Sequence, residues 1–157
     1  MIFLRNHIIK IISTFFYIGY LPFIPGTFGS LAAIFLFCII RDSTAVYLLF
    51  TCLLMILGFL TSGEAERIMN KKDPGCIVID EVSGMFIGLL FLPYYDFNIL
   101  TAAFLLFRIF DTVKPYPAWR LQKLKGSIGV MSDDIIAGIY TNIVLQAVFR
   151  CASCRAS

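Results

Sequence analysis

The amino-acid sequence predicts an all-α fold, a polytopic membrane helix bundle with about five apolar helices and one interfacial segment, in a single integral membrane domain over residues 1–157. Two observations predict this class. Hydrophobic residues make up 59% of the chain and charged residues only 15%, which is more apolar than a typical water-soluble domain. The apolar residues also form five runs, separated by short segments that hold most of the charges and prolines.

Residues 1–18 are predicted to be an amphipathic or membrane-associated N-terminus. Arg5 and Lys10 precede the apolar residues 11–18, as in an export signal. No small-residue cleavage site follows, so the segment is expected to stay with the protein.

The next segment, residues 19–30, reads GYLPFIPGTFGS, and its glycines and prolines exclude a continuous helix. Its PGT step, Pro25, Gly26 and Thr27, opens the first apolar run. It is either a plain connector or a helix N-terminus whose free amides bind phosphate.

The five apolar runs are the predicted helices of the bundle. About 20 helical residues span a hydrocarbon core of about 30 Å, so only the second run is comfortably long. The others must tilt, thin the bilayer or extend into their flanks. The runs are residues 28–40, 44–62, 82–92, 97–110 and 135–149.

The basic residues predict the orientation. If all five runs cross, only Arg41, Arg150 and Arg155 fall on one side, and by the positive-inside rule the opposite, more basic side is cytoplasmic. The small net charge of +3 suits an anionic lipid surface rather than nucleic acid, so the bilayer is an expected partner and nucleic acid is not. The cytoplasmic set is Arg5, Lys10, Arg67, Lys71, Lys72, Lys114, Arg120, Lys123 and Lys125.

Two segments flank the last run. Residues 116–125, YPAWRLQKLK, mix Trp119 and leucines with basic residues and are the predicted interfacial segment. Residues 150–157 are predicted to be a flexible tail. The CxxC spacing of Cys151 and Cys154, without a second pair or a nearby histidine, is more typical of incidental thiols than of a zinc or redox site.

Carboxylates stand at the ends of three apolar runs. Asp80 and Glu81 enter the third run, Asp111 and Lys114 close the fourth, and the sequence MSDD at 131–134 opens the fifth. An acid inside a membrane helix costs about 2.5 to 3.5 kcal/mol, so such carboxylates indicate function. In the five-helix topology these segments and the PGT step all reach the cytoplasmic face, which favours one shared polar site there.

A stripe of small residues runs beside the first of these acids. Asp80, Gly84 and Gly88 repeat every four residues, which predicts the close approach of another helix next to the carboxylate. Ordinary helix dimerisation is the alternative interpretation.

The residue types limit the chemistry of such a site. The only histidine, His7, is far from the acids in sequence, which argues against a histidine nucleophile, a His-rich zinc centre and a Ser-His-Asp triad. Clustered carboxylates repel one another unless a cation neutralises them, and hard oxygen ligands select Mg²⁺. Lys114 is placed to neutralise charge on a phosphate.

Each group also has a structural interpretation. Arg108 and Asp111 could form an ion pair that allows an arginine in an apolar helix, and Asp133 with Asp134 could be the acidic N-terminus of the last helix. Asp73 could be a turn residue before a proline. For the whole chain, a small cation transporter with buried acidic residues and a non-catalytic helical assembly subunit are the alternatives, although the outer halves of the runs offer almost no polar path for transport.

Three blocks of the chain closely resemble the phosphatidylglycerophosphatase A family, and the motif-bearing part covers about residues 19–140. The resemblance implies a magnesium-dependent phosphatidylglycerophosphatase of the bacterial inner membrane, multi-pass, with its active site facing the cytoplasm. It would hydrolyse the terminal phosphate monoester of its phospholipid substrate, phosphatidylglycerophosphate, to phosphatidylglycerol and inorganic phosphate. The blocks are PGTFGSL at 25–31, DPGCIVIDEVSG at 73–84, and FRIFDTVKPYP at 107–117 running on to GVMSDDIIAG at 129–138.

The residues and the resemblance together predict a mechanism in which water activated by the metal attacks the phosphate while a carboxylate takes its proton. The predicted metal ligands are Asp80, Glu81, Asp111, Asp133 and Asp134, and these five with Lys114 are the predicted catalytic residues. The predicted substrate-binding residues are Pro25, Gly26, Thr27, Arg108 and Lys114.

Overall fold

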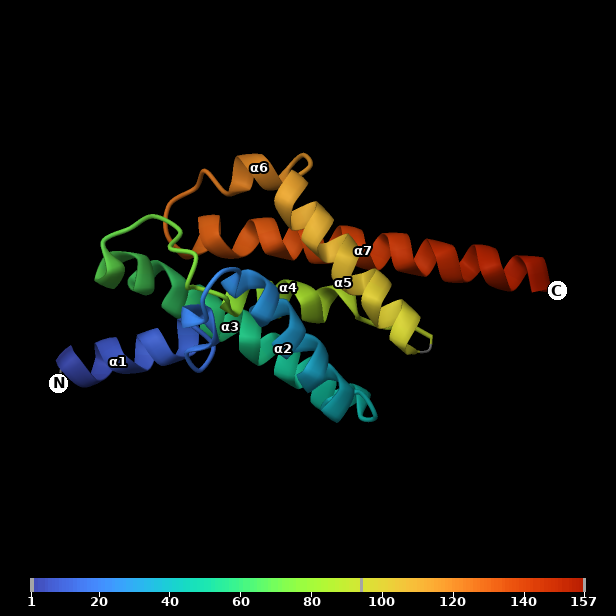
Figure 1. The fold of residues 1–157 in the computed structure, drawn as a ribbon, viewed down its shortest axis with the longest axis horizontal. Coiled ribbons are helices and arrows are strands. Elements are labelled where there is room, and N and C mark those ends of the chain that lie inside the picture. The colour runs from blue at the N-terminus through green and yellow to red at the C-terminus, as the bar shows by residue number, and fades with distance from the viewer. Residues whose placement is uncertain (1, 94, 157) are drawn as a thin grey trace.

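The computed structural model of the chain describes residues 2–93 and 95–156, with side chains as far as Cys151. Every regular element in these residues is a helix, and the described residues contain no strand, so the predicted all-α class is confirmed (Figure 1). The elements are α1 Ile2–Ser13, the 3₁₀ turn η1 Ile18–Tyr20, α2 Pro25–Ile40, α3 Thr44–Met69, α4 Ile79–Gly88, α5 Phe97–Val113, α6 Ala118–Leu121 and α7 Ser127–Ala156.

Four of the five apolar runs lie within a helix, the run at 82–92 is helical only as far as Gly88, and two helices extend well beyond their runs. Helix α3 continues past residue 62 to Met69, and α7 begins at Ser127 rather than at 135. The extensions pack on each other, because the Gly63 amide donates a 2.8 Å hydrogen bond to the Ser127 hydroxyl. Tertiary contact therefore stabilises helical turns that hydropathy alone does not predict.

Helix α4 is too short to be the spanning helix predicted over 82–92. Its 10 residues give a length of about 15 Å, half of a hydrocarbon core, and the following residues 89–91 form turns. It lies instead at the centre of the bundle, in contact with α2, α3, α5 and α7 (Figure 1). Val82, Met85 and Phe86 are fully buried, so α4 is apolar because protein surrounds it.

Two helices among the described residues are long and apolar enough to cross a membrane. They are α3, Thr44–Met69, and residues Ser127–Cys151 of α7. Five crossing helices therefore stay a prediction.

Helices α4 and α7 pack closely at the predicted small-residue stripe. A Cβ atom placed on Gly84 would lie 2.5 Å from the Asp134 carbonyl oxygen, and one on Gly138 would lie 2.2 Å from the Gly84 carbonyl oxygen. At Gly88 the neighbour is the side chain of Thr141, at 3.3 Å. The predicted close approach of another helix beside Asp80 is thus confirmed, and the partner is α7.

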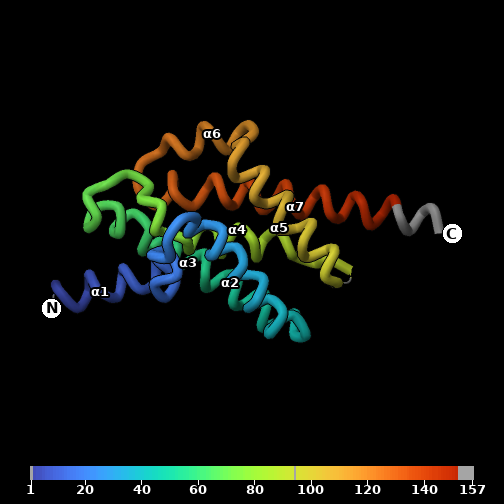
Figure 2. The backbone as a smooth tube through the Cα atoms, viewed as in Figure 1, coloured from blue at the N-terminus to red at the C-terminus, as the bar shows by residue number. Residues whose placement is uncertain are grey.

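The chain passes back and forth along the bundle (Figure 2). The starts of α2, α4 and α7 therefore lie at the same end as the last turns of α3 and α5. Three contacts establish this arrangement: Gly26 against Glu81, Gly63 against Ser127, and Lys114 against Asp133.

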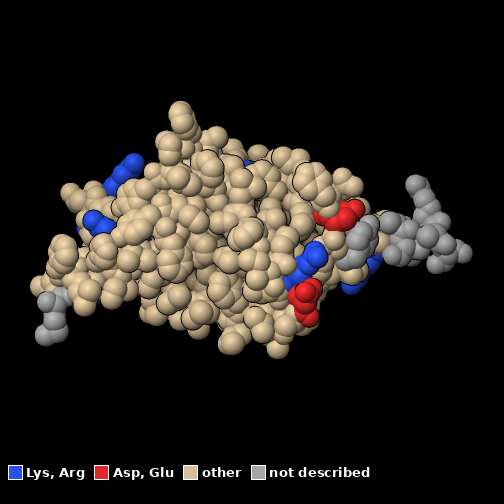
Figure 3. All heavy atoms as spheres, turned by 60° about the horizontal axis from the view of Figure 1, so that its bottom comes forward, with Lys and Arg blue, Asp and Glu red and all other residues tan. Residues whose placement is uncertain are grey.

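The outer faces of α2 and α3 are strongly apolar. Phe35, Ile39, Leu49, Ile56 and Leu60 are all exposed, and on the face in Figure 3 the charged side chains gather towards the two ends of the molecule. A contiguous apolar surface of this kind is unusual for a protein surrounded by water.

The predicted terminal segments differ in outcome. Helix α1 exposes Ile2, Phe3 and Leu4, which suits the predicted membrane-associated N-terminus without testing it. Helix α7 continues to Ala156, so the segment predicted as a flexible tail is helical as far as it is described. The side chain of Cys154 lies outside the described residues.

Candidate active site

Helix α4 begins after the DPG turn at 73–75 and three connecting residues, and it carries Asp80 and Glu81 in its first turn. The Ile77 amide donates to the Pro74 carbonyl at 2.8 Å, and the Val78 amide donates to the Ser13 carbonyl at 3.0 Å, which ties the start of α4 to the end of α1. Carboxylates are favoured at this position because the helix N-terminus carries partial positive charge.

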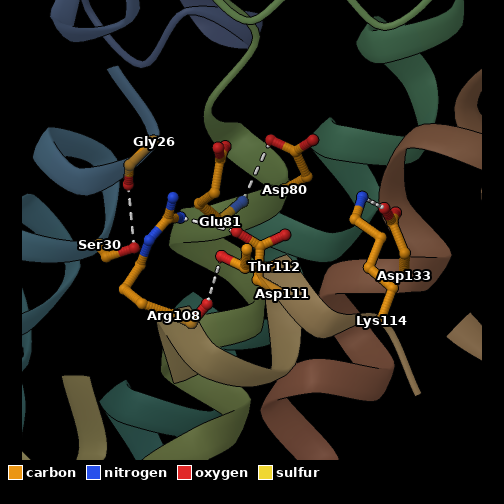
Figure 4. Close-up of polar contacts among 9 residues, drawn as sticks. All are labelled: Gly26, Ser30, Asp80, Glu81, Arg108, Asp111, Thr112, Lys114 and Asp133. Carbon is orange, nitrogen blue, oxygen red and sulfur yellow. Dashed lines mark hydrogen bonds and ion pairs between the residues drawn. The ribbon is translucent and has the colours of Figure 1, made fainter. Parts of the chain in front are cut away.

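Helix α5 ends at Val113, and Lys114 follows it in the left-handed conformation with φ 47°. Pro115 cannot continue the helix. The Lys114 ammonium forms an ion pair with the Asp133 carboxylate on α7 (Figure 4). The turn after α5 thus aims its cation at the acidic part of α7.

Asp133 and Asp134 lie well inside α7, whose first turn contains no acidic residue. The structural interpretation of this pair as the acidic N-terminus of the last helix is therefore wrong, since the helix dipole acts within about one turn of the end. Asp133 and Asp134 expose only 4% and 3% of their surface. Because the helix dipole does not reach them, their buried negative charges need another positively charged partner.

Helix α2 begins with Pro25, a favourable first residue because its missing N–H needs no partner there. The Thr27 and Phe28 amides donate to the Ile24 carbonyl at 3.1 and 3.3 Å, so they are not the free donors that the PGT step was predicted to offer to phosphate. Gly26 has another contact: a Cβ atom there would lie 2.2 Å from Glu81 Oε1.

Three carboxylates from α4 and α7 meet at one point. Ligand oxygens of Asp80, Glu81 and Asp134 all lie within 4.8 Å of one another, and together they could hold a metal ion. Asp80 and Asp134 are 5% and 3% exposed and Glu81 is half-buried, so the group is largely shielded from solvent as well as compact. We refer to Asp80, Glu81 and Asp134 as the acidic trio.

The other two predicted ligands lie beside the acidic trio and are paired with cations. Asp111 Oδ2 is 2.8 Å from Arg108 Nη1, so the predicted ion pair exists, and Asp133 is paired with Lys114. Asp111 is still close enough to interact electrostatically with Glu81 and Asp134. Residues of the four helices α2, α4, α5 and α7 therefore lie around one polar centre (Figure 4).

Several buried oxygens in this centre lack a hydrogen-bond donor. They are Glu81 Oε2, Asp133 Oδ1 and Asp134 Oδ1. Buried polar atoms are normally satisfied, and the unpaired oxygens of Glu81 and Asp134 belong to the acidic trio, whose carboxylates are the kind of ligand that a hard divalent cation prefers. The residues present therefore fit a metal ion of this kind.

Two cations border the carboxylates on the α5 side. Burial alone lowers the pKa of the Lys114 ammonium, but its hydrogen bond to Asp133 and the charges of Asp133, Asp134 and Asp111 outweigh burial and raise that pKa. Lys114 is thus a cation at neutral pH. Arg108 Nη1 is buried and lies 2.8 Å from Asp111 Oδ2, so the guanidinium is paired with one carboxylate and brings a positive charge to the edge of the site.

The sequence predicted Asp73 to be a turn residue, and the structure shows that it also lies near the carboxylate centre. Asp73 has φ 44°, as expected of a turn residue, and its amide donates to Glu66 Oε1 at 2.7 Å. Its carboxylate accepts a 3.4 Å hydrogen bond from the Gln122 amide and interacts electrostatically with Asp80 and Asp133. The signal was present in the sequence, because Asp73 opens the same block that contains Asp80.

Fold and site together define an all-helical protein with a buried carboxylate centre, suited to a divalent cation and bordered by two cations suited to an anion such as phosphate. Comparison with known proteins agrees with this class. The sequence model of the family Phosphatidylglycerophosphatase A matches residues 11–149, and the chain belongs to this family.

Individual relatives cover most of the chain. A protein of Haemophilus influenzae named phosphatidylglycerophosphatase A is 39% identical over 79% of this chain and 78% of its own length. A protein of the same name from Escherichia coli is 37% identical over 83% of this chain and 77% of its own length.

A further relative carries a different name. It is a putative phosphatidylinositol-3-phosphatase of Bacteroides thetaiotaomicron, 37% identical over 89% of this chain and 92% of its own length. No solved structure is significantly similar to the chain.

Proposed function

We propose that this protein is a magnesium-dependent phosphatidylglycerophosphatase, which hydrolyses the terminal phosphate monoester of phosphatidylglycerophosphate and leaves phosphatidylglycerol and inorganic phosphate. The observation that carries the proposal is the buried acidic trio with Lys114 and Arg108 beside it, in a chain of the phosphatidylglycerophosphatase A family. A phosphatase of this kind must hold both a metal and a phosphate, and the centre offers anionic and cationic partners for them.

The acidic trio would hold Mg²⁺, with Asp111 and Asp133 completing the shell directly or through water. Mg²⁺ binds oxygen ligands and retains several waters, which a centre of carboxylates can accommodate. When bound, it would polarise the phosphoryl group and make water a better nucleophile at neutral pH.

The remaining roles belong to the chain's own side chains. Arg108 and Lys114, each already paired with one carboxylate of the centre, would use their remaining N–H groups to bind phosphate oxygens and neutralise their charge. A carboxylate of the centre would take a proton from the attacking water as the new P–O bond forms. The bond from phosphorus to the lipid oxygen breaks in line, and the released alkoxide takes up a proton.

The same geometry supports a proposed membrane placement. All motif segments lie at one end of the bundle, which is also where Lys72 donates to the Lys123 carbonyl at 3.4 Å. We place this end at the cytoplasmic face of the bacterial inner membrane, with the apolar faces of α2 and α3 in the lipid and the chain multi-pass. A phospholipid head group in that leaflet would then reach the acidic trio without leaving the bilayer.

Orientation is tested with single cysteines in a variant whose native cysteines are replaced. Cysteines at Lys71 and Lys123 should react from the same side of the membrane, and one at Tyr95 from the opposite side. Labelling of the first two from different sides would contradict the single cytoplasmic site.

A cation transporter is less well supported. The core next to the acidic trio consists of Val82, Met85, Phe86 and Phe107, all fully buried and apolar. An ion that left the trio towards the opposite end would have to cross this layer, where the buried hydroxyls of Ser83 and Thr141 already donate to carbonyls of their own helices.

Phosphate release from purified protein tests the proposed activity. We expect release from phosphatidylglycerophosphate with Mg²⁺, none in excess chelator, and recovery when Mg²⁺ is added back. Phosphatidylinositol 3-phosphate and phosphatidic acid serve as competing substrates, because the Bacteroides relative is named for the first of these lipids. Undiminished release in chelator would refute the metal dependence, and faster release from phosphatidylinositol 3-phosphate would refute the proposed head group.

A further inference from the structure

A second polar cavity lies between the end of α3 and the segment that joins α6 to α7. Its volume is about 510 Å³, and no residue of the acidic trio lines it. Its lining is Gly63, Glu66, Arg67, Asn70, Lys71, Lys72, Lys125 and Gly126. We refer to it as the basic pocket.

The basic pocket concentrates the positive charge of the protein. Four cations and one carboxylate line it, a net charge of +3, which equals the formal net charge of the whole chain. The rest of the protein is therefore electrically balanced. Such a local excess of one sign attracts counter-ions of the other sign.

The cations of the basic pocket are largely unpaired. Arg67 forms an ion pair with Glu64 at 2.6 Å, outside the pocket lining. Within the described residues no carboxylate pairs with Lys71, Lys72 or Lys125. Glu66, the one acid in the lining, already accepts the Asp73 amide, so an external anion is the available partner for the lysines.

The lysines come from parts of the chain that are distant in sequence. Lys71 and Lys72 follow α3, and Lys125 precedes α7. The two segments are held together by the bonds from Gly63 to Ser127 and from Lys72 to the Lys123 carbonyl. The fold therefore forms a concave group of cations, whereas scattered surface lysines would point apart.

We propose that the basic pocket is a second anion site, separate from the acidic trio, that binds a phosphate group, either that of an anionic phospholipid head group or free orthophosphate. Lysine ammonium groups bind phosphate as point charges, and the volume of the basic pocket leaves room for one phosphate group. At the membrane face proposed above, anionic head groups lie at the level of these lysines. The inference goes beyond the proposed hydrolysis and does not depend on its substrate.

Two charge-matched variants test the basic pocket. Lys71→Gln with Lys125→Gln removes two cations from it, and Arg5→Gln with Lys10→Gln removes two cations from α1 as the control. Retention of phosphatidylglycerol by the full-length protein in neutral detergent is measured by native mass spectrometry, and binding of inorganic phosphate by isothermal titration calorimetry. Thermal unfolding in the same detergent checks that both variants are folded.

We expect the pocket variant to bind one of the two probes about thirtyfold more weakly than the wild type, with little change in the control, since each cation near an anionic lipid contributes about a factor of five. If only the binding of phosphatidylglycerol is weakened, the basic pocket is a lipid head-group site. If only the binding of inorganic phosphate is weakened, it is an orthophosphate site. Equal losses in both variants would mean unspecific surface attraction and overturn the proposal, as would unchanged binding of both probes in the pocket variant.

Discussion

Gly26 is where the structure makes its sharpest prediction, because replacement by alanine should separate activity from stability. The added Cβ atom would lie 2.2 Å from Glu81 Oε1 and 3.1 Å from Arg108 Nη1. Real Cβ atoms essentially never approach another atom within 3.0 Å, so the carboxylate oxygen must retreat by roughly 1 Å. A misplacement of this size in a catalytic site can reduce the rate about 100-fold.

Stability should respond differently. The obstructing atom is the end of a flexible side chain, and Gly26 lies in a helix, where alanine is preferred over glycine by up to about 1 kcal/mol. We therefore expect Gly26→Ala to have a melting temperature equal to or slightly above that of the wild type, together with a kcat/KM lower by about two orders of magnitude.

The assay is phosphate release at several substrate concentrations, paired with thermal unfolding in the same detergent. Gly75→Ala is the matched control, because a Cβ atom on Gly75 meets nothing within 4 Å. A Gly26→Ala protein with wild-type kcat/KM would refute the reasoning, since it would mean that catalysis tolerates a displaced Glu81 carboxylate.

Three further predictions concern the acids and the helix packing. Asp134→Asn should reduce phosphate release by orders of magnitude without affecting folding, because the metal site loses a negative charge. Glu64→Gln is the control and should have little effect, since its exposed ion pair with Arg67 contributes little to stability. Equal activity of the two variants would remove Asp134 from the site. The double variant Arg108→Leu with Asp111→Leu should be folded by circular dichroism but inactive, and near wild-type turnover would reduce the pair to a structural role. Gly138→Ala should lower the free energy of unfolding, measured by denaturant titration, by about 1–3 kcal/mol. The reason is that the added Cβ atom meets the backbone carbonyl of Gly84, which cannot move aside. Unchanged stability would show that α4 and α7 can separate freely.

Much of the fold was accessible to sequence reasoning because it depends on local patterns. Apolar runs of helical length predict helices, and a helix lies at each of the five runs, although the one at 82–92 ends early, at Gly88. The alternation of runs and motif segments also predicts that Asp80, Asp111 and Asp134 meet at one end. Reversal of direction at each connection is enough for that, and no knowledge of side-chain packing is needed.

Helix ends and burial were less accessible. The run at 82–92 is as apolar as a short membrane helix, yet α4 stops at Gly88 and is enclosed by four other helices. Hydropathy cannot separate an apolar segment that faces lipid from one that faces protein. The start of α7 at Ser127 likewise depends on a contact with Gly63, which is distant in the chain.

By itself, the sequence determined the helical class, the acids that can take part in chemistry, and the family. Only the tertiary structure decided which acids form the trio, that Asp133 is paired with Lys114, and that Gly26 makes room for Glu81. The physical reason is how far apart in the chain the residues that set each property lie. Helix formation and charge placement follow from neighbours a few residues apart, whereas distances of a few ångströms between side chains of different helices are set by how closely α4 and α7 can pack.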